Sequence, residues 1–409
     1  MKKLIGPFAE IIPLTGLATG GAINDSRLQI INHGGVIVEN GLILQTGNFE
    51  ELKALYPALP LEEIIEESVL IPGFVDCHTH ICFAGSRAKD YSLRIQGKSY
   101  LEIAKSGGGI WDSVTQTRLA GEDLLTSLLL KRVQRHLTEG VTTIEVKSGY
   151  GLNLDNELKQ LRTIAKVNGQ TAADLIPTCL AAHLLPKDFK GSAMDYLNDV
   201  IENLLPVIKA EQLAGRVDIF IEESAFDVPA ALHYLMAAKA MGFQLTVHAD
   251  QFTTGGLEVA VQTGALSADH LEASGTQEIG LISGSDTVAV VLPGASLGLG
   301  MSYAPARKLL DAGACVAIAS DWNPGSAPMG DLLMQAAVMS ASEKLSTAEV
   351  FAGITFRAAR ALGLHDRGKL ETGMKADMQA YPCSDYREIV YHQGKMKPYT
   401  VWKSGVQIS

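Results

Sequence analysis

The stretch Ile71-Pro72-Gly73-Phe74-Val75-Asp76-Cys77-His78-Thr79-His80 decides the fold of this chain and indicates its chemistry. Residues 71–76 are apolar enough to form a buried strand, and side chains at positions i and i+2 of a strand point the same way. We therefore expect the imidazoles of His78 and His80 to emerge together at the C-terminal end of that strand. Two neutral imidazoles that converge are a natural clamp for a divalent metal such as Zn, Fe or Mn.

The composition indicates a large enzyme rather than a nucleic-acid-binding protein. The chain has 409 residues, of which 47% are hydrophobic and 19% are charged, which suits one large α/β barrel with a small appendage. The net charge of −11 argues against a nucleic-acid surface. Five cysteines at scattered spacings give no disulfide framework and indicate a reducing compartment.

The N-terminus and the hydropathy predict a cytoplasmic protein. Met1-Lys2-Lys3 could begin a signal peptide, but Pro7, Glu10 and Pro13 interrupt the apolar segment that would have to follow. No run of about 18 apolar residues, the length of a membrane span, occurs in the sequence.

Both ends of the chain contain short runs of residues with the pattern of β-strands. Residues 1–70 contain Gly35-Val36-Ile37-Val38 and Gly41-Leu42-Ile43-Leu44, and residues 371–409 contain similar runs around 376–380 and 399–405. Neither end is long enough to build its own core. We therefore expect one small β-sandwich-like domain formed by both termini, at 1–70 plus 371–409.

Between these ends, apolar runs alternate with helical periodicity. Helix-like stretches include 122–137 and 229–241, where Pro229 suits the start of a helix. This alternation predicts parallel βα units, closed as a (β/α)8 TIM barrel over residues 71–370. The expected strands are 71–76, 141–147, 174–182, 217–223, 243–249, 266–269, 287–292 and 314–320.

Active sites of such barrels lie at the C-terminal ends of the strands, and polar residues follow the apolar runs of this chain there. His78 and His80 with three later histidines make five of the ten in the sequence. The residues at these strand ends are His78, His80, Glu145, Lys147, Tyr150, His183, His248, His270 and Asp321.

One metal ion is expected at the barrel mouth. His78, His80, His248 and Asp321 would surround it and leave a position open to water, which distinguishes a catalytic site from a structural one. Asp321 could also accept a proton from that water, and His270 could hydrogen-bond the water or the oxyanion formed on a substrate.

Three nearby side chains have alternative interpretations. Cys77 and Cys82 flank the histidines and could be soft ligands, but strand alternation turns Cys77 away, which favours packing. Lys147 could be carbamylated and bridge two metals, or could simply pair with Glu145. We favour the ion pair between Lys147 and Glu145, and a single metal ion.

This arrangement resembles the amidohydrolase superfamily, and more narrowly the imidazolonepropionase family, through essentially the whole chain. The narrower family is indicated by segments beyond the metal-binding motif. The resemblance is carried by Asp76-Cys77-His78-Thr79-His80, Phe83-Ala84-Gly85-Ser86-Arg87, residues 94–103, Gly107-Gly108-Gly109-Ile110, residues 145–152, His248-Ala249-Asp250-Gln251 and residues 320–326.

The resemblance implies a function and a site. It implies hydrolysis of 4-imidazolone-5-propanoate to N-formimidoyl-L-glutamate in histidine degradation, with one Zn or Fe ion per chain. It implies His78, His80, His248 and Asp321 as ligands. Around the substrate it implies Arg87, Tyr150, His183, Gln251, Asn323, Gly325 and Ser326. A fork-shaped donor such as Arg87 suits the substrate's carboxylate.

Gln251 departs from a pattern of related deaminases, which often carry a proton-shuttling Glu at this position. Because Gln cannot titrate, proton transfer would fall to Asp321, His270 or water. Gln251 is kept with these two as a candidate catalytic residue.

Two other functions remain possible from the sequence. A deaminase acting on a purine, pyrimidine or related ring is the nearest enzymatic alternative, against which Gln251 and Arg87 argue. A non-catalytic scaffold would have lost metal ligands, and here none is missing. A small-molecule substrate and a homodimer are expected, without nucleic-acid or membrane partners.

Overall fold

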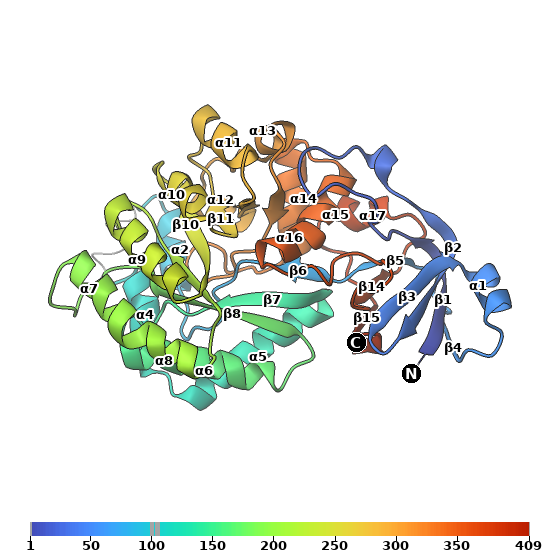
Figure 1. The fold of residues 1–409 in the computed structure, drawn as a ribbon, viewed down its shortest axis with the longest axis horizontal. Helices are drawn as coiled ribbons and strands as arrows, with labels where there is room; N and C mark the ends of the chain where they lie inside the picture. The colour runs from blue at the N-terminus through green and yellow to red at the C-terminus, as the bar shows by residue number, and fades with distance from the viewer. Residues whose placement is uncertain (1, 99–101, 103–106, 409) are drawn as a thin grey trace.

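The computed structural model describes residues 2–98, 102 and 107–408, and within these it contains two sheets joined by the chain near Gly73 (Figure 1). Residues 99–101 and 103, which belong to the 94–103 segment quoted above, lie outside the described residues.

One of the two sheets is a barrel of parallel strands. Its hydrogen-bonded order follows the chain, and the strands are β6 (Phe74–Asp76), β7 (Val141–Lys147), β8 (Asp174–Ala182), β9 (Arg216–Ile219), β10 (Gln244–Ala249), β11 (Ser267–His270), β12 (Val288–Val291) and β13 (Val316–Ile318). The ring closes just beyond β6 and β13, where Thr79 pairs with Trp322 and the Asp321 N–H donates to the His78 carbonyl at 3.0 Å. The predicted (β/α)8 barrel is confirmed.

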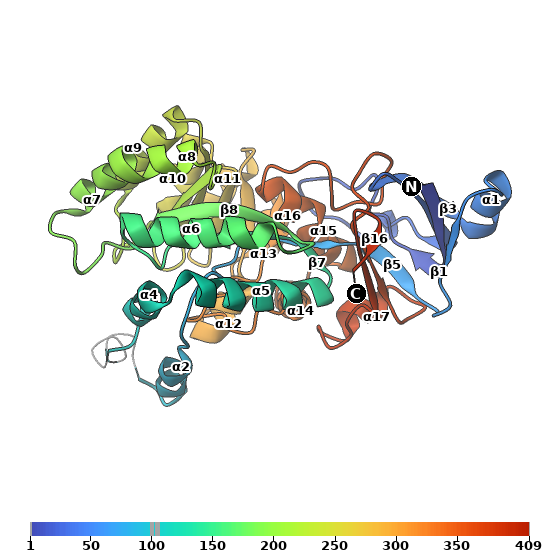
Figure 2. The same cartoon turned by 90° about the horizontal axis from the view of Figure 1, so that it is seen from below.

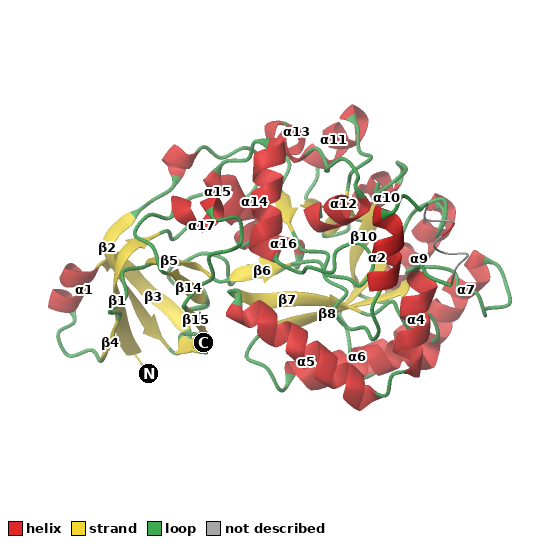
Figure 3. Cartoon of the chain, turned by 180° about the vertical axis from the view of Figure 1, so that it is seen from behind, coloured by secondary structure: helices red, strands yellow, loops and turns green. Residues whose placement is uncertain are grey.

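Helices cover the outside of the barrel (Figures 2 and 3). The two quoted stretches correspond to α5 (Glu122–Thr138) and α9 (Val228–Ala240), and α9 begins one residue before Pro229 because the Asp227 side chain accepts from Ala230 N–H. The other described helices are α1 (Phe49–Leu55), α2 (Ala88–Ile95), α4 (Ile110–Leu119), α6 (Leu154–Asn168), α7 (Ala193–Asp199), α8 (Leu205–Ala210), α10 (Gly256–Thr263), α11 (Thr276–Ser283), α12 (Pro293–Leu299), α13 (Ala306–Asp311), α14 (Leu332–Glu343), α15 (Thr347–Gly353), α16 (Phe356–Ala361) and α17 (Arg387–Tyr391).

The other sheet, called the small sheet after the small β domain predicted from the two ends of the chain, combines strands from both ends, as expected. Its strands are β1 (Lys2–Ile11), β2 (Ile31–Glu39), β3 (Leu42–Asn48), β4 (Leu61–Glu63), β5 (Val69–Pro72), β14 (Met378–Tyr381), β15 (Thr400–Lys403) and β16 (Val406–Gln407). β5 pairs with β14, which joins the N-terminal and C-terminal segments. Phe8 of β1 meets Trp402 of β15 edge to face, with ring centroids 6.1 Å apart, so the sheet encloses a core of its own.

The prediction of one strand over 71–76 was wrong. Residues 71–72 belong to β5 in the small sheet and only 74–76 to the barrel. The backbone changes partners at Gly73, whose N–H donates to Asp377, whereas the next N–H donates to Gly140 of the barrel. β9 is also shorter than predicted and ends at Ile219; Phe220 follows as an isolated bridge to His248.

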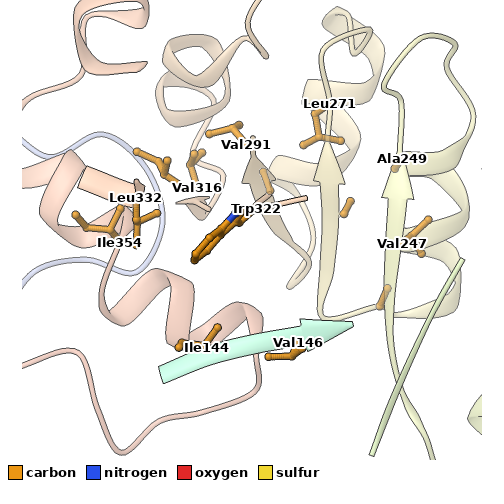
Figure 4. Close-up of a cluster of buried hydrophobic side chains, with 14 of the residues drawn as sticks. Ile144, Val146, Val247, Ala249, Leu271, Val291, Val316, Trp322, Leu332 and Ile354 are labelled. Atoms are coloured by element: carbon orange, nitrogen blue, oxygen red, sulfur yellow. The ribbon is translucent and has the colours of Figure 1, made fainter. Parts of the chain in front are cut away.

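The main core lies between the barrel strands and the helices around them (Figure 4). Ile144, Val247, Val291 and Trp322 are among its buried side chains. Burial of about 25 cal/mol per Å² of apolar surface makes such a layer the main stabilising contribution to the barrel. Among the residues that the structure describes, no helix combines the length and apolar character needed to cross a membrane.

Candidate active site

Three imidazoles meet at the C-terminal mouth of the barrel. His78 and His80 follow β6, and His248 lies near the end of β10. Nε2 of His80 is 3.2 Å from Nε2 of His78 and 3.3 Å from Nε2 of His248. Two nitrogens bound about 2.05 Å from one tetrahedral ion are about 3.3 Å apart. The three nitrogens therefore have the spacing of donors that share one ion.

Asp321 completes this group from the loop after β13. Its Oδ1 lies 3.6 Å from Nε2 of His78 and 3.4 Å from Nε2 of His80. Asp321 has a φ of +47°, in the left-handed region that non-glycine residues seldom adopt. Burial raises the pKa of Asp321, against the opposing effect of His270 and His248. Three imidazoles and a carboxylate are a donor set that suits a catalytic metal.

The histidines of this group are held in the neutral form that a metal needs. Burial lowers the pKa of His78 and of His80 well below the ordinary value, and neighbouring cationic groups lower them further. Burial likewise lowers the pKa of His248, to about 3, although Asp218 opposes the shift. Neutral imidazoles keep a lone pair available for a metal.

Two carboxylates that the sequence analysis did not select orient two of these rings. Asp269 Oδ2 is 2.6 Å from Nδ1 of His78, and Asp218 Oδ2 is 2.9 Å from Nδ1 of His248. A ligating histidine commonly donates its other N–H to a carboxylate in this way. The available signal was an acidic residue inside each of two predicted strands, Asp218 in 217–223 and Asp269 in 266–269.

Lys147 makes ion pairs with three buried carboxylates, two of which contact the imidazoles. Its Nζ is 2.8 Å from Glu145 and 2.8 Å from Asp218, and 4.0 Å from Asp269. Burial would lower the pKa of Lys147, but Asp218 and Glu145 outweigh it and raise that pKa above its ordinary value. These contacts favour the ion-paired interpretation over a carbamylated lysine.

His270 reaches the site from the end of β11 with a φ of +89°. Its Nδ1 lies 3.6 Å from Glu272 Oε2, a residue that the sequence analysis did not select. Burial would lower the pKa of His270, but Glu272 outweighs it and raises that pKa. Glu272 is fixed in turn by the Ser296 hydroxyl, which donates to its Oε1 at 2.9 Å.

A cavity of about 830 Å³ opens beside these groups. The structure brings to it His80, His248, His270, Asp321 and every residue expected around the substrate: Arg87, Tyr150, His183, Gln251, Asn323, Gly325 and Ser326. Arg94, Lys98 and Glu222 also line it and were not selected from the sequence.

Some polar atoms of these lining residues already form hydrogen bonds within the protein, and others do not. The Asn323 amide donates to the Asp321 carbonyl and accepts from the Gly325 and Ser326 N–H groups, so it shapes its own loop. His183 Nδ1 is 2.9 Å from the Gly149 carbonyl, which turns its Nε2 the other way. Burial lowers the pKa of His183.

The two cysteines beside the histidines pack in the core. Cys77 lies with Val75 and Val288 in a buried apolar cluster. The Cys82 thiol points to the Gln160 carbonyl at 3.8 Å, and burial raises its pKa to about 12. Neither thiol is positioned as a ligand.

A barrel that gathers three imidazoles and a carboxylate at the ends of its strands defines a class, the metal-dependent hydrolases. The sequence profile of the amidohydrolase family matches residues 69–408, so the chain belongs to that family. Within it, the chain is similar to curated imidazolonepropionases. That of Bacillus cytotoxicus is 39% identical over 92% of this chain and 89% of its own length, and that of Bacillus mycoides is 38% identical over 98% and 94%.

Solved structures support the fold. A guanine deaminase from C. acetobutylicum superposes over 100% of both chains, with a TM-score of 0.73 and 15% identity. An adenosine deaminase from Xanthomonas campestris with bound zinc gives a TM-score of 0.71 and 17% identity over 99% of this chain and 92% of its own. At such identities the likeness concerns the fold alone.

Proposed function

We propose that this protein hydrolyses 4-imidazolone-5-propanoate to N-formimidoyl-L-glutamate in histidine degradation. One observation carries the proposal: the imidazole and carboxylate group shares a cavity with Arg87, in a chain similar over nearly its whole length to curated imidazolonepropionases. The ring supplies a C–N bond for hydrolysis, and the propionate supplies a carboxylate for the guanidinium.

The metal would be held by His78, His80, His248 and Asp321, one Zn or Fe ion per chain. When bound, such an ion polarises a carbonyl and lowers the pKa of a coordinated water. Both metals suit this mixed nitrogen and oxygen donor set.

Side chains of the protein would carry out proton transfer, stabilise the developing negative charge and position the reacting groups. Asp321 takes a proton as water adds to the ring carbonyl carbon, and His270 donates a hydrogen bond to the oxygen that gains negative charge. The ring C–N bond then breaks, the nitrogen leaves with a proton, and a new carboxylate remains. Gln251 lines the same cavity and, as an amide, positions groups by hydrogen bonding without exchanging protons.

The substrate would be oriented by other side chains that line the same cavity. Arg87 would hold the propionate, and Tyr150 and His183 would hydrogen-bond polar atoms of the substrate. Gly325 and Ser326 belong to the loop that also carries Asp321, so this loop would connect substrate binding with catalysis. We further propose a cytoplasmic homodimer, because two-fold dimers are the commonest assemblies of soluble enzymes.

The test is the loss of ultraviolet absorbance of 4-imidazolone-5-propanoate with the purified, metal-loaded protein. We expect rapid loss, with N-formimidoyl-L-glutamate as the product by mass spectrometry. Asp321→Asn should keep the fold by circular dichroism and reduce kcat at least 100-fold, an effect on the order expected for a general base. No absorbance loss with a full complement of metal would reject this substrate. Near-normal turnover by the variant would remove Asp321 from proton transfer.

A further inference from the structure

We propose that Lys147 is a positioning residue of the metal site, whose ammonium group fixes two of the three imidazole ligands through Asp218 and Asp269. The inference rests on the metal site of the proposed function but not on its substrate. Lys147 touches neither the cavity nor a ligand nitrogen in any described contact; it contacts the carboxylates behind the ligands.

The contacts form two branches from one cation. The first runs from Nζ of Lys147 over 2.8 Å to Asp218 Oδ2, which lies 2.9 Å from Nδ1 of His248. The second runs over 4.0 Å to Asp269 Oδ2, which lies 2.6 Å from Nδ1 of His78. In each branch the oxygen facing the lysine is the one facing the imidazole. Displacement of the ammonium group would therefore disturb both rings.

The tautomer of each ring follows from these contacts. A metal-ligating histidine commonly donates its other N–H to a carboxylate, and Nδ1 of each of these rings faces one. Nδ1 of His78 and of His248 is then the donor, and Nε2 of each is left with its lone pair toward the common centre. The lysine contacts the same carboxylate oxygens that face these two nitrogens.

The charges around Lys147 show why one cation is needed. Glu145, Asp218 and Asp269 bring three carboxyl groups into a region where their side chains are at most 1% exposed. Buried charge requires a partner, and Lys147 is shared by all three. Without it, Asp218 and Asp269 would repel each other and lose their fixed positions behind the rings.

His80 provides a contrast within the same site. Among the described ion pairs, a carboxylate lies against Nδ1 of His78 and of His248, whereas His80 faces a carboxylate only through its Nε2. The Lys147 network therefore orients His78 and His248 but not His80.

The experiment measures metal affinity, which needs no substrate. The protein is stripped with a chelator and titrated with Zn²⁺ against a chromophoric competitor, as wild type and as Lys147→Met. We expect the variant to bind about 10- to 100-fold more weakly, the range for loss of an outer-shell partner. In an Asp218→Asn, Asp269→Asn background the same lysine substitution should add little, because both carboxylates through which the lysine acts on the rings have already lost their charge. A Kd within twofold of wild type for Lys147→Met, or full additivity of the lysine and carboxylate changes, would overturn the proposal.

The control is Lys403→Met. Lys403 is also a buried lysine between two carboxylates, with Nζ 2.9 Å from Asp174 and 2.6 Å from Asp377, but it lies in β15 of the small sheet. It should lose stability and keep the wild-type Kd; an equal loss of affinity would reduce the effect to general destabilisation and overturn the proposal. If Lys147→Met does not fold, Lys147→Met with Glu145→Gln removes one carboxylate charge but leaves Asp218 and Asp269. Wild-type affinity in that double variant would also overturn the proposal.

Discussion

At the scale of the residue, Arg87 has a guanidinium whose position is fixed by its neighbours. Its Nε donates to the Asp90 carboxylate, and its Nη1 lies 3.5 Å from the Ser113 hydroxyl. Asp90 also accepts from the Gly109 N–H at 2.8 Å. The loop at Gly325 also lies beside the guanidinium, since a Cβ there would be at van der Waals distance from Nη1, 3.4 Å away. The group is held in place before any substrate arrives.

Arg87→Ala should therefore raise KM for the propionate-bearing substrate. Loss of a hydrogen bond to a charged group weakens binding by about 1.5–3 kcal/mol, roughly 10- to 100-fold. Steady-state kinetics on the purified variant give the value. Arg87→Lys is the matched control and should be intermediate, because it keeps the charge but loses the fork. An unchanged KM in Arg87→Ala would place the carboxylate elsewhere, with Arg94 and Lys98 on the same cavity as the next positions to test.

The sequence predicts the site residues that follow apolar runs, but it does not predict the carboxylates that hold those residues in place. His248 and Asp321 follow such runs, and the barrel rule alone predicts that they converge. Asp218 and Asp269 act across strands, on rings contributed by other segments, and one sequence does not show which charge faces which imidazole. The inward position of His270 depends on its positive φ, which the pattern of residue types does not show either.

At the scale of the element, the loop after β7 is held by the first turns of α6. Glu157 Oε1 accepts from the N–H groups of Gly151 at 2.8 Å and Leu152 at 2.7 Å, and Oε2 accepts from Gly149 at 3.1 Å. Tyr150 N–H donates to the Gln160 side chain at 3.1 Å. Two side chains of α6 thus position the backbone on which Tyr150 enters the cavity.

Glu157→Gln should loosen this loop, because an amide has one acceptor oxygen and its NH₂ would face backbone donors. We expect a loss of about 1–3 kcal/mol in unfolding free energy, the typical effect of a buried unsatisfied group, together with a lower kcat/KM. Urea denaturation and kinetics measure the two effects. Asp155→Asn, an exposed change of the same chemistry in the same helix, should alter neither. Wild-type values for Glu157→Gln would show that the loop holds its shape without this carboxylate.

The ends of a strand could be predicted from the sequence where the whole apolar run belongs to one sheet. β7 and β8 have the predicted bounds, since both are long buried strands within the barrel. The run at 71–76 is shared between two sheets, and its apolar residues fit either one. Its division at Gly73 depends on Asp377, a residue about 300 positions away, and a Cβ at Gly73 would meet the Thr142 side chain at 2.6 Å. Such a division requires tertiary structure.

At the scale of the whole molecule, one carboxylate ties the barrel to the small sheet. Asp174 begins β8, and its Oδ2 accepts from Arg367 at 2.5 Å, Lys375 at 3.0 Å and Lys403 at 2.9 Å. Burial alone would raise the pKa of Asp174, but these cations hold it well below its usual range. This ion network therefore lies at the junction of the two sheets. The domain boundaries at residues 70 and 371 stay a prediction.

Asp174→Asn should destabilise the protein in a pH-dependent way. A carboxyl group with a lower pKa in the folded chain stabilises the fold above its unfolded-state pKa of about 4 and loses this contribution as the pH falls. The side chain is 34% exposed, so we expect about 1–2 kcal/mol at pH 7, between the values for exposed and buried pairs. Urea denaturation at pH 7, 5 and 3.5 should show the difference from wild type shrinking below pH 4. Asp286→Asn, which breaks an exposed pair with Arg360, should stay within about 0.5 kcal/mol at every pH. Equal stability of Asp174→Asn and wild type at pH 7 would mean that this ion network does not stabilise the junction of the two sheets.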